Sequence, residues 1–184
     1  MARKAGEDLD KISDIVHSFF ENKRIVETLE KIGSFGVSGW EKWWQVEFAL
    51  FLSHADDVIA DWDMEHPFET DKRTKLAQSR MALDIGFRLK RQAKDRWYFV
   101  ELKQADSYRA CIDKMIKDAD KVFSARKKSF DGLNIKYIAC AGVFRKADEE
   151  EVLDYVEDEL DKAGIDHDGF YFENLAKGYC LLVF

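Results

Sequence analysis

The chain has few of the residues that interrupt or cross-link a fold. Its 184 residues include one proline, Pro67, and three cysteines without a CxxC pair. Proline- or glycine-rich linkers would separate domains, and paired cysteines would indicate a zinc site or a disulfide framework. We therefore expect a single domain over residues 1–184, with neither zinc nor disulfide bonds.

Long apolar runs and nucleotide-binding motifs are also missing. No stretch approaches the roughly 18 uninterrupted apolar residues of a membrane span, and residues 1–10 carry many charges. These absences predict a cytoplasmic protein without a membrane partner. The chain has no GxGxxG or Walker-type loop, and its histidines have no HxH or HxxxH spacing. Nucleotide cofactors and histidine metal sites therefore have no support.

Charge is distributed unevenly along the chain. The formal net charge is −7, but residues 72–128 hold 17 Lys/Arg against 7 Asp/Glu, and residues 145–184 hold 4 against 12. A basic middle segment can face phosphate groups while the acidic C-terminal part faces water. Solvated helix and strand faces produce the same charge runs, so charge alone does not decide between these interpretations.

Apolar periodicity predicts an α/β protein with a mixed central sheet flanked by helices. Helical spacing covers residues 9–29, with a break near Asn22, and then 40–52, 108–123 and 148–163. Strand patterns cover residues 58–69, 81–90, 97–103, 135–144, 170–172 and 179–184, the last two forming a hairpin. Ser38 and Glu41 have the spacing of a capping box at the start of the second helix, which is apolar on almost every side and contains Glu47.

Two of these strands bring acidic residues together. If the turn 91–96 is centred near Gln92 and Ala93, Asp84 lies opposite Glu101, with Cβ atoms roughly 4.5–5.5 Å apart. Carboxylates that close repel each other unless a cation lies between them. Mg²⁺ is typically held by one or two carboxylates plus substrate phosphate. The hairpin therefore predicts a magnesium site at these two residues, with Lys103 on the same side of the sheet to orient a water.

The segment Met-Ala-Leu-Asp-Ile-Gly-Phe around Asp84, followed after the hairpin by Val-Glu-Leu-Lys at 100–103, resembles the PD-(D/E)XK superfamily of restriction-endonuclease-like nucleases. The predicted elements over about 40–144 are similar to the αβββαβ core of that family. Here the core has an added N-terminal helix and a C-terminal helix plus strands. Leu83 stands where the family name has its proline.

The resemblance implies roles for individual residues. In the family the Asp and the Glu hold Mg²⁺, and the Lys assists the water, which gives those roles to Asp84, Glu101 and Lys103. Mn²⁺ is the expected substitute for Mg²⁺. The carbonyl of the residue between Glu and Lys often adds a ligand, which here is Leu102.

The family also suggests residues outside the hairpin. Many members carry a glutamate on the helix before the sheet, and we choose Glu47 because an acid embedded in apolar sequence is costly without a partner or a metal. Glu41 is the less favoured choice because the capping box already gives it a local role. Contacts with substrate phosphate are expected, as weaker assignments, from Gln104, Lys114 and Lys117.

The resemblance implies a Mg²⁺-dependent endo- or exodeoxyribonuclease that hydrolyses DNA phosphodiester bonds with a metal-activated water. RNA is an alternative substrate, and a homodimer is a further expectation because small nucleases of this type are often dimers. The alternative function is a catalytically inactive module of the same fold that binds nucleic acid or a protein partner. In that case Asp84 and Glu101 are a carboxylate pair that Lys103 neutralises on a partly buried sheet, without metal or catalysis.

Overall fold

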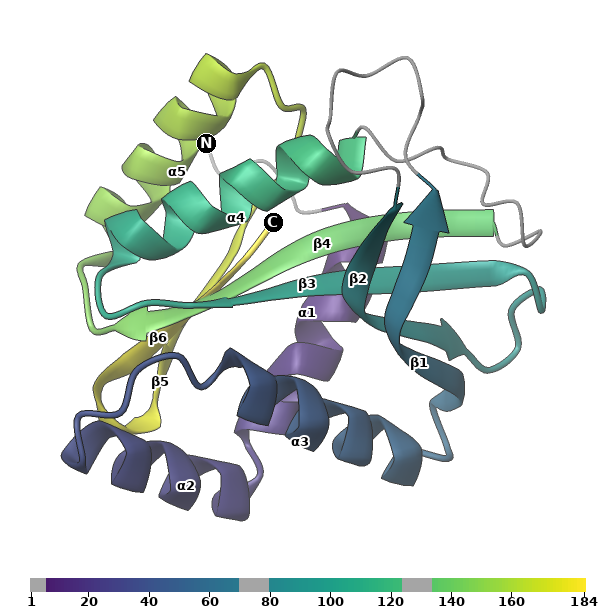
Figure 1. Cartoon of the computed structure of the whole chain (residues 1–184), viewed down its shortest axis with the longest axis horizontal. Coiled ribbons are helices and arrows are strands. Elements are labelled where there is room, and N and C mark those ends of the chain that lie inside the picture. The colour runs from purple at the N-terminus through teal and green to yellow at the C-terminus, as the bar shows by residue number, and fades with distance from the viewer. Residues whose placement is uncertain (1–5, 70–79, 124–133) are drawn as a thin grey trace.

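The computed structural model describes residues 6–69, 80–123 and 134–184. Within these ranges the chain forms a mixed six-stranded sheet with five α-helices packed on it (Figure 1). The helices are α1 Glu7–Phe20, α2 Lys23–Ser34, α3 Glu41–His54, α4 Tyr108–Phe123 and α5 Glu149–Ala163. The strands are β1 Ile59–Glu69, β2 Arg80–Leu89, β3 Arg96–Gln104, β4 Asn134–Arg145, β5 Tyr171–Leu175 and β6 Tyr179–Val183. The predicted α/β class and mixed sheet are confirmed.

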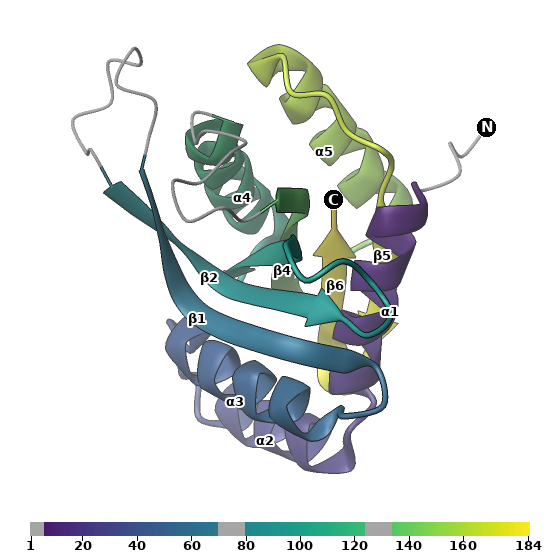
Figure 2. The ribbon, with the colours of Figure 1, turned by 90° about the vertical axis from the view of Figure 1, so that its right-hand side faces the viewer.

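The sheet has the strand order β1-β2-β3-β4-β6-β5. Only β3 and β4 pair in parallel among the described strands, and α4 forms the crossover between them; the other neighbouring pairs are antiparallel. Helices α1, α2 and α3 cover one face of the sheet, and α4 and α5 cover the other (Figure 2). The predicted C-terminal hairpin is the β5–β6 pair.

Alternation along β3 divides its side chains between the two faces. Tyr98, Val100 and Leu102 are buried with the apolar residues of α1 to α3. Glu101 and Lys103 have the opposite orientation and lie beneath α4, where Lys103 contacts a residue of that helix. No helix in the described part of the chain is both long enough and apolar enough to cross a membrane.

A local side chain caps the start of α2, but none caps the start of α3. Asn22 ends the first predicted helical segment and starts α2, because its side chain accepts a hydrogen bond from the amide of Arg24 at 3.0 Å. The predicted capping box of Ser38 and Glu41 is wrong. The N-cap of α3 is Trp40, without a side-chain cap. Glu41 instead accepts a hydrogen bond from the amide of Gln104 at 3.0 Å.

The edge strand β1 satisfies some of its own backbone donors. The amide of Trp62 donates to Asp61 Oδ1 at 3.0 Å, and the amide of Met64 donates to Asp63 Oδ1 at 2.8 Å. These two amides are two residues apart, so they point to the same edge of the strand. Each is therefore capped by the side chain that precedes it.

Helix α4 lies very close to β4 at Gly142. A Cβ atom on that glycine would overlap Met115 Sδ and would lie 2.9 Å from Cys111 Sγ. Only a residue without a side chain lets the helix approach the strand this closely.

We expect Gly142→Ala to lower the free energy of unfolding by about 1–3 kcal/mol, because the added methyl group overpacks the interface between α4 and β4. Urea denaturation measures the change. The matched control is the same substitution in a Met115→Ala background, where the space vacated by Met115 should make Gly142→Ala less costly. Equal costs in both backgrounds would contradict the overpacking explanation.

Candidate functional site

The candidate site lies where β2 leaves β3. Along the ladder between these strands, Ile85 pairs with Val100, Gly86 with Phe99 and Phe87 with Tyr98. Continuing this register by one residue beyond Ile85 places Asp84 opposite Glu101, as the sequence predicted. β3 continues to Gln104, paired with β4 on its other side.

Asp84 provides a hydrogen-bond acceptor at this point of separation. Its Oδ2 accepts a hydrogen bond from the amide of Leu102 at 2.8 Å, a donor that a paired strand would otherwise satisfy. Its Oδ1 accepts a hydrogen bond from the side-chain amide of Gln45 on α3. Gln45 Oε1 in turn accepts a hydrogen bond from Lys42 Nζ at 2.9 Å. The carboxylate is therefore held in one orientation from two sides.

Glu101 lies directly beside Asp84 and is 8% exposed. Its Oε2 accepts a hydrogen bond from the backbone amide of Asp84 at 3.3 Å. Burial, and then the nearby carboxylate of Asp84, raise the pKa of Glu101 to about 7, and burial also raises the pKa of Asp84. Ionising both acids at once is unfavourable because their negative charges repel each other. A proton on one of them, or a cation between them, relieves this repulsion.

Lys103 provides a cation inside this cluster. Its Nζ lies 3.0 Å from Glu101 Oε1, 3.1 Å from the carbonyl oxygen of Leu102 and 2.8 Å from Asp118 Oδ2. Burial by itself would lower the pKa of Lys103, but the carboxylates of Glu101 and Asp118 outweigh it and raise the pKa. The side chain is therefore a protonated ammonium held by three oxygen atoms.

Asp118 was not predicted from the sequence. It lies on α4, seven residues after Cys111, whose side chain is buried against the sheet. Residues 111, 115 and 118 have the spacing i, i+4, i+7, so they share one face of the helix. Cys111 and Met115 on this face are apolar, and Asp118 is an acid. This difference in the sequence could have indicated that Asp118 contacts a buried cation.

The structure does not bring Glu47 to the hairpin acids. Its carboxylate forms an ion pair with Arg24 on α2, with 2.9 Å between Arg24 Nη1 and Glu47 Oε1, and this hydrogen bond lowers the pKa of Glu47. Glu41 and Gln45 are four residues apart and face the sheet together. Glu47 is about 200° further round the helix than Gln45, and so it points toward α2.

Of the residues expected to contact phosphate, two lie beside the site. Gln104 is 3% exposed, and its side-chain oxygen accepts a hydrogen bond from the amide of Gly39 at 2.9 Å. Lys114 Nζ donates to the carbonyl oxygen of Gln104 at 3.0 Å and remains half exposed. Much of the basic segment, including residues 72–75 and 126–128, lies outside the described residues.

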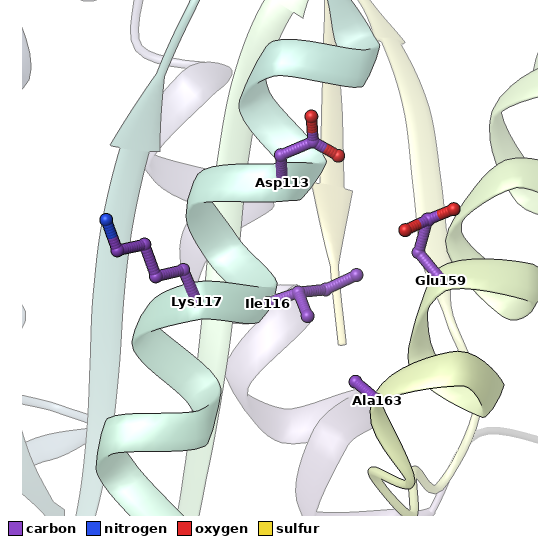
Figure 3. Close-up of a pocket in the computed structure, with 5 residues that line it drawn as sticks. All are labelled: Asp113, Ile116, Lys117, Glu159 and Ala163. Atoms are coloured by element: carbon purple, nitrogen blue, oxygen red, sulfur yellow. The ribbon is translucent and has the colours of Figure 1, made fainter.

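Lys117 has a different position. It lines a groove of about 450 Å³ between α4 and α5, with Asp113, Ile116, Glu159 and Ala163. In Figure 3 its side chain extends from the side of α4 that is turned away from α5. Two acids of the groove already have partners, because Asp113 accepts a hydrogen bond from Tyr155 and Glu159 pairs with Lys162. The groove contains none of the hairpin residues.

The donor set of the site fits a hard divalent cation. Carboxylates from Asp84 and Glu101 and the carbonyl of Leu102 are oxygen ligands of the kind that Mg²⁺ prefers. The Lys103 ammonium already contacts two of these three groups and acts as a stand-in cation. Among the described residues, no group of three or more His, Cys, Asp or Glu side chains could hold a metal. Backbone, water or substrate oxygens would have to complete the coordination.

Comparison with known proteins identifies no relative: no family model, no curated protein and no solved structure matches the chain. The resemblance to the PD-(D/E)XK superfamily therefore depends on the hairpin residues and on the order of the elements around them. Function has to be inferred from the chemistry of the site itself.

The metal-free protein should lose stability as the pH rises from about 4.5 to about 7. Glu101 binds its proton more tightly in the folded state than in the unfolded chain, so its contribution to stability is complete below the lower value and is lost as the pH passes the higher one. Relative to a Glu101→Gln variant, we expect a loss of about 1–3 kcal/mol across this window. Denaturant unfolding in EDTA measures it, and a pH-independent difference between the two proteins would contradict the assignment.

Proposed function

We propose that this protein is a Mg²⁺-dependent nuclease of the PD-(D/E)XK type that hydrolyses DNA phosphodiester bonds. The observation that carries the proposal is the contact of a buried ammonium, Lys103, with Glu101 Oε1 and the carbonyl of Leu102, next to the carboxylate of Asp84. A lysine two residues after a buried glutamate, beside an aspartate on the neighbouring strand, is similar to the arrangement with which this family holds Mg²⁺ and assists the attacking water.

The order of the elements also supports the proposal. From α3 to β4 the chain runs helix, three antiparallel strands, helix and parallel strand, which is similar to the αβββαβ core of the family. This core corresponds to about residues 40–144. α1 and α2 precede it, and α5, β5 and β6 follow it.

The residues of the chain have separate tasks in this proposal. Asp84, Glu101 and the Leu102 carbonyl hold Mg²⁺, which when bound lowers the pKa of a coordinated water and neutralises phosphate charge. Lys103 orients the attacking water and stabilises the charge that builds up on the phosphate. Leu102 and Gln45 fix the orientation of Asp84 before substrate arrives, which reduces the reorganisation needed in the reaction.

Exposed lysines around the site can bind the DNA backbone. Lys42 on α3 and Lys114 on α4 are each more than half exposed. Lys42 donates a hydrogen bond to the side chain of Gln45, and Lys114 donates one to the carbonyl oxygen of Gln104. Together with the basic residues between 72 and 128, they provide positive charge that attracts phosphate without reading sequence.

One observation favours the alternative of a noncatalytic binding module. Asp84 and Glu101 already have hydrogen-bond or ion-pair partners within the protein, from Gln45, Leu102 and Lys103. A fold stabilised in this way does not need a metal for its own integrity. Metal binding therefore distinguishes the two functions.

The purified protein should cleave plasmid or single-stranded DNA with Mg²⁺ or Mn²⁺, and EDTA should stop the reaction. Asp84→Asn and Lys103→Ala should each lower the rate by about 100-fold or more, because each removes a group that holds or stabilises the reacting charge. Gel assays of initial rates measure this effect.

Glu47→Gln is the matched control on the same helix as Gln45, and it should cleave at a rate close to that of the wild type. If Glu47→Gln lowered the cleavage rate as much as Asp84→Asn, Glu47 would have to be counted among the active-site residues. If the wild type neither cleaves DNA nor binds metal in calorimetry, the binding module replaces the nuclease.

A further inference from the structure

The ammonium of Lys103 occupies the position that a metal ion would need. It donates to three oxygen atoms, and two of them, Glu101 Oε1 and the carbonyl oxygen of Leu102, belong to the proposed metal ligands. An ammonium and a divalent cation repel each other strongly at the distances of a shared ligand set. A metal can therefore bind fully only if the ammonium gives up these two contacts.

We infer that Asp118 is the positioning residue that keeps hold of Lys103 when a divalent cation takes its place at Glu101 and Leu102, an inference that rests on the proposed function. Asp118 is the third oxygen partner of the ammonium and the nearest of the three, at 2.8 Å. It comes from α4 instead of the hairpin, and it is not one of the proposed metal ligands. Its contact with Lys103 can therefore persist after the other two are lost.

Burial makes such a partner necessary. The side chains of Lys103 and Asp118 are 10% and 15% exposed, so an ammonium displaced from Glu101 cannot simply move into bulk water. A buried charge that loses its partners is strongly destabilising unless another partner remains. The Asp118 carboxylate provides that partner and so reduces the cost of displacing the ammonium.

The position of Asp118 is fixed by the packing of α4. Met115 and Cys111, one and two turns earlier on the same helix face, pack against β4 at Gly142. The helix therefore holds the carboxylate at a defined height above β3. Metal binding and ammonium movement are coupled in this arrangement, and α4 sets where the ammonium stands beside the substrate.

A double-mutant cycle on Mn²⁺ affinity tests this coupling without relying on catalysis. The proteins are the wild type, Lys103→Met, Asp118→Asn and the double variant, each titrated with Mn²⁺ by calorimetry. Lys103→Met should bind about tenfold more tightly because the competing ammonium is gone. Asp118→Asn should bind about tenfold more weakly because the ammonium then stays on Glu101.

The decisive comparison is Asp118→Asn in the Lys103→Met background. In that background Asp118 can no longer act through the Lys103 ammonium, so the substitution should change the affinity by less than about threefold. An equal weakening in both backgrounds would mean that Asp118 acts only as a distant negative charge, and it would overturn the inference. Asp118→Glu, which retains a carboxylate for Lys103, should restore most of the affinity lost in Asp118→Asn.

Steady-state kinetics provide a second test, because a purely structural role of Asp118 would not produce the pattern expected here. Asp118→Asn should lower kcat while leaving KM for DNA nearly unchanged, and it should have no effect on residual cleavage in a Lys103→Ala background. If neither the wild type nor Lys103→Met binds Mn²⁺, the proposed function fails together with this inference. If the wild type binds Mn²⁺ and cleaves DNA but the cycle shows no coupling, only the role of Asp118 fails.

Discussion

The site depends on how β3 satisfies its backbone donors after β2 has left it. Two carboxylates accept hydrogen bonds from amides in this part of the strand: Asp84 from Leu102 and Glu41 from Gln104. Backbone amides that are buried without a partner are costly, so these side chains replace the carbonyls of a neighbouring strand. The departure of β2 opens space beside β3 and leaves amides that need other acceptors, which in this protein are the carboxylates of Asp84 and Glu41.

These acceptors bring carboxylates into the cluster before any ligand is considered. Once Asp84 accepts from the backbone, Glu101 lies against a second carboxylate in a buried position, and its pKa rises to about 7. Lys103 relieves this conflict from within the chain. A buried ion pair of this kind contributes little net stability, but removing one partner leaves an uncompensated charge. The cluster is therefore stable as a unit and sensitive to the loss of any single member.

Much of the fold and the centre of the site could be predicted from the sequence. The turn between β2 and β3 determines the register, so the proximity of Asp84 and Glu101 followed from counting residues. The residue that α3 contributes to the site could not be predicted in this way. That helix is apolar on nearly all sides, so its sequence pattern does not indicate which face meets the sheet. Gln45 was therefore overlooked in favour of Glu47, whose partner Arg24 lies on another helix.

Tertiary contacts also overrode local motifs. Glu41 has the spacing of a capping box, yet an amide at the end of β3 is its hydrogen-bond donor. Such a donor is more than 60 residues away in the chain, and only the assembled sheet brings it near. Asp118 is similar, because its partner Lys103 becomes a neighbour only through the packing of α4 on the sheet.

The capped amides of β1 affect how the molecule meets other chains. A free strand edge is a template on which another extended segment, including the same strand of a second copy, can add and extend the sheet. Asp61 and Asp63 occupy two of the donors that such an added strand would need. Their negative charge would also face its own copy across an antiparallel seam. This edge therefore resists the addition of another strand, and β1 is a poor place for two molecules to join into one continuous sheet.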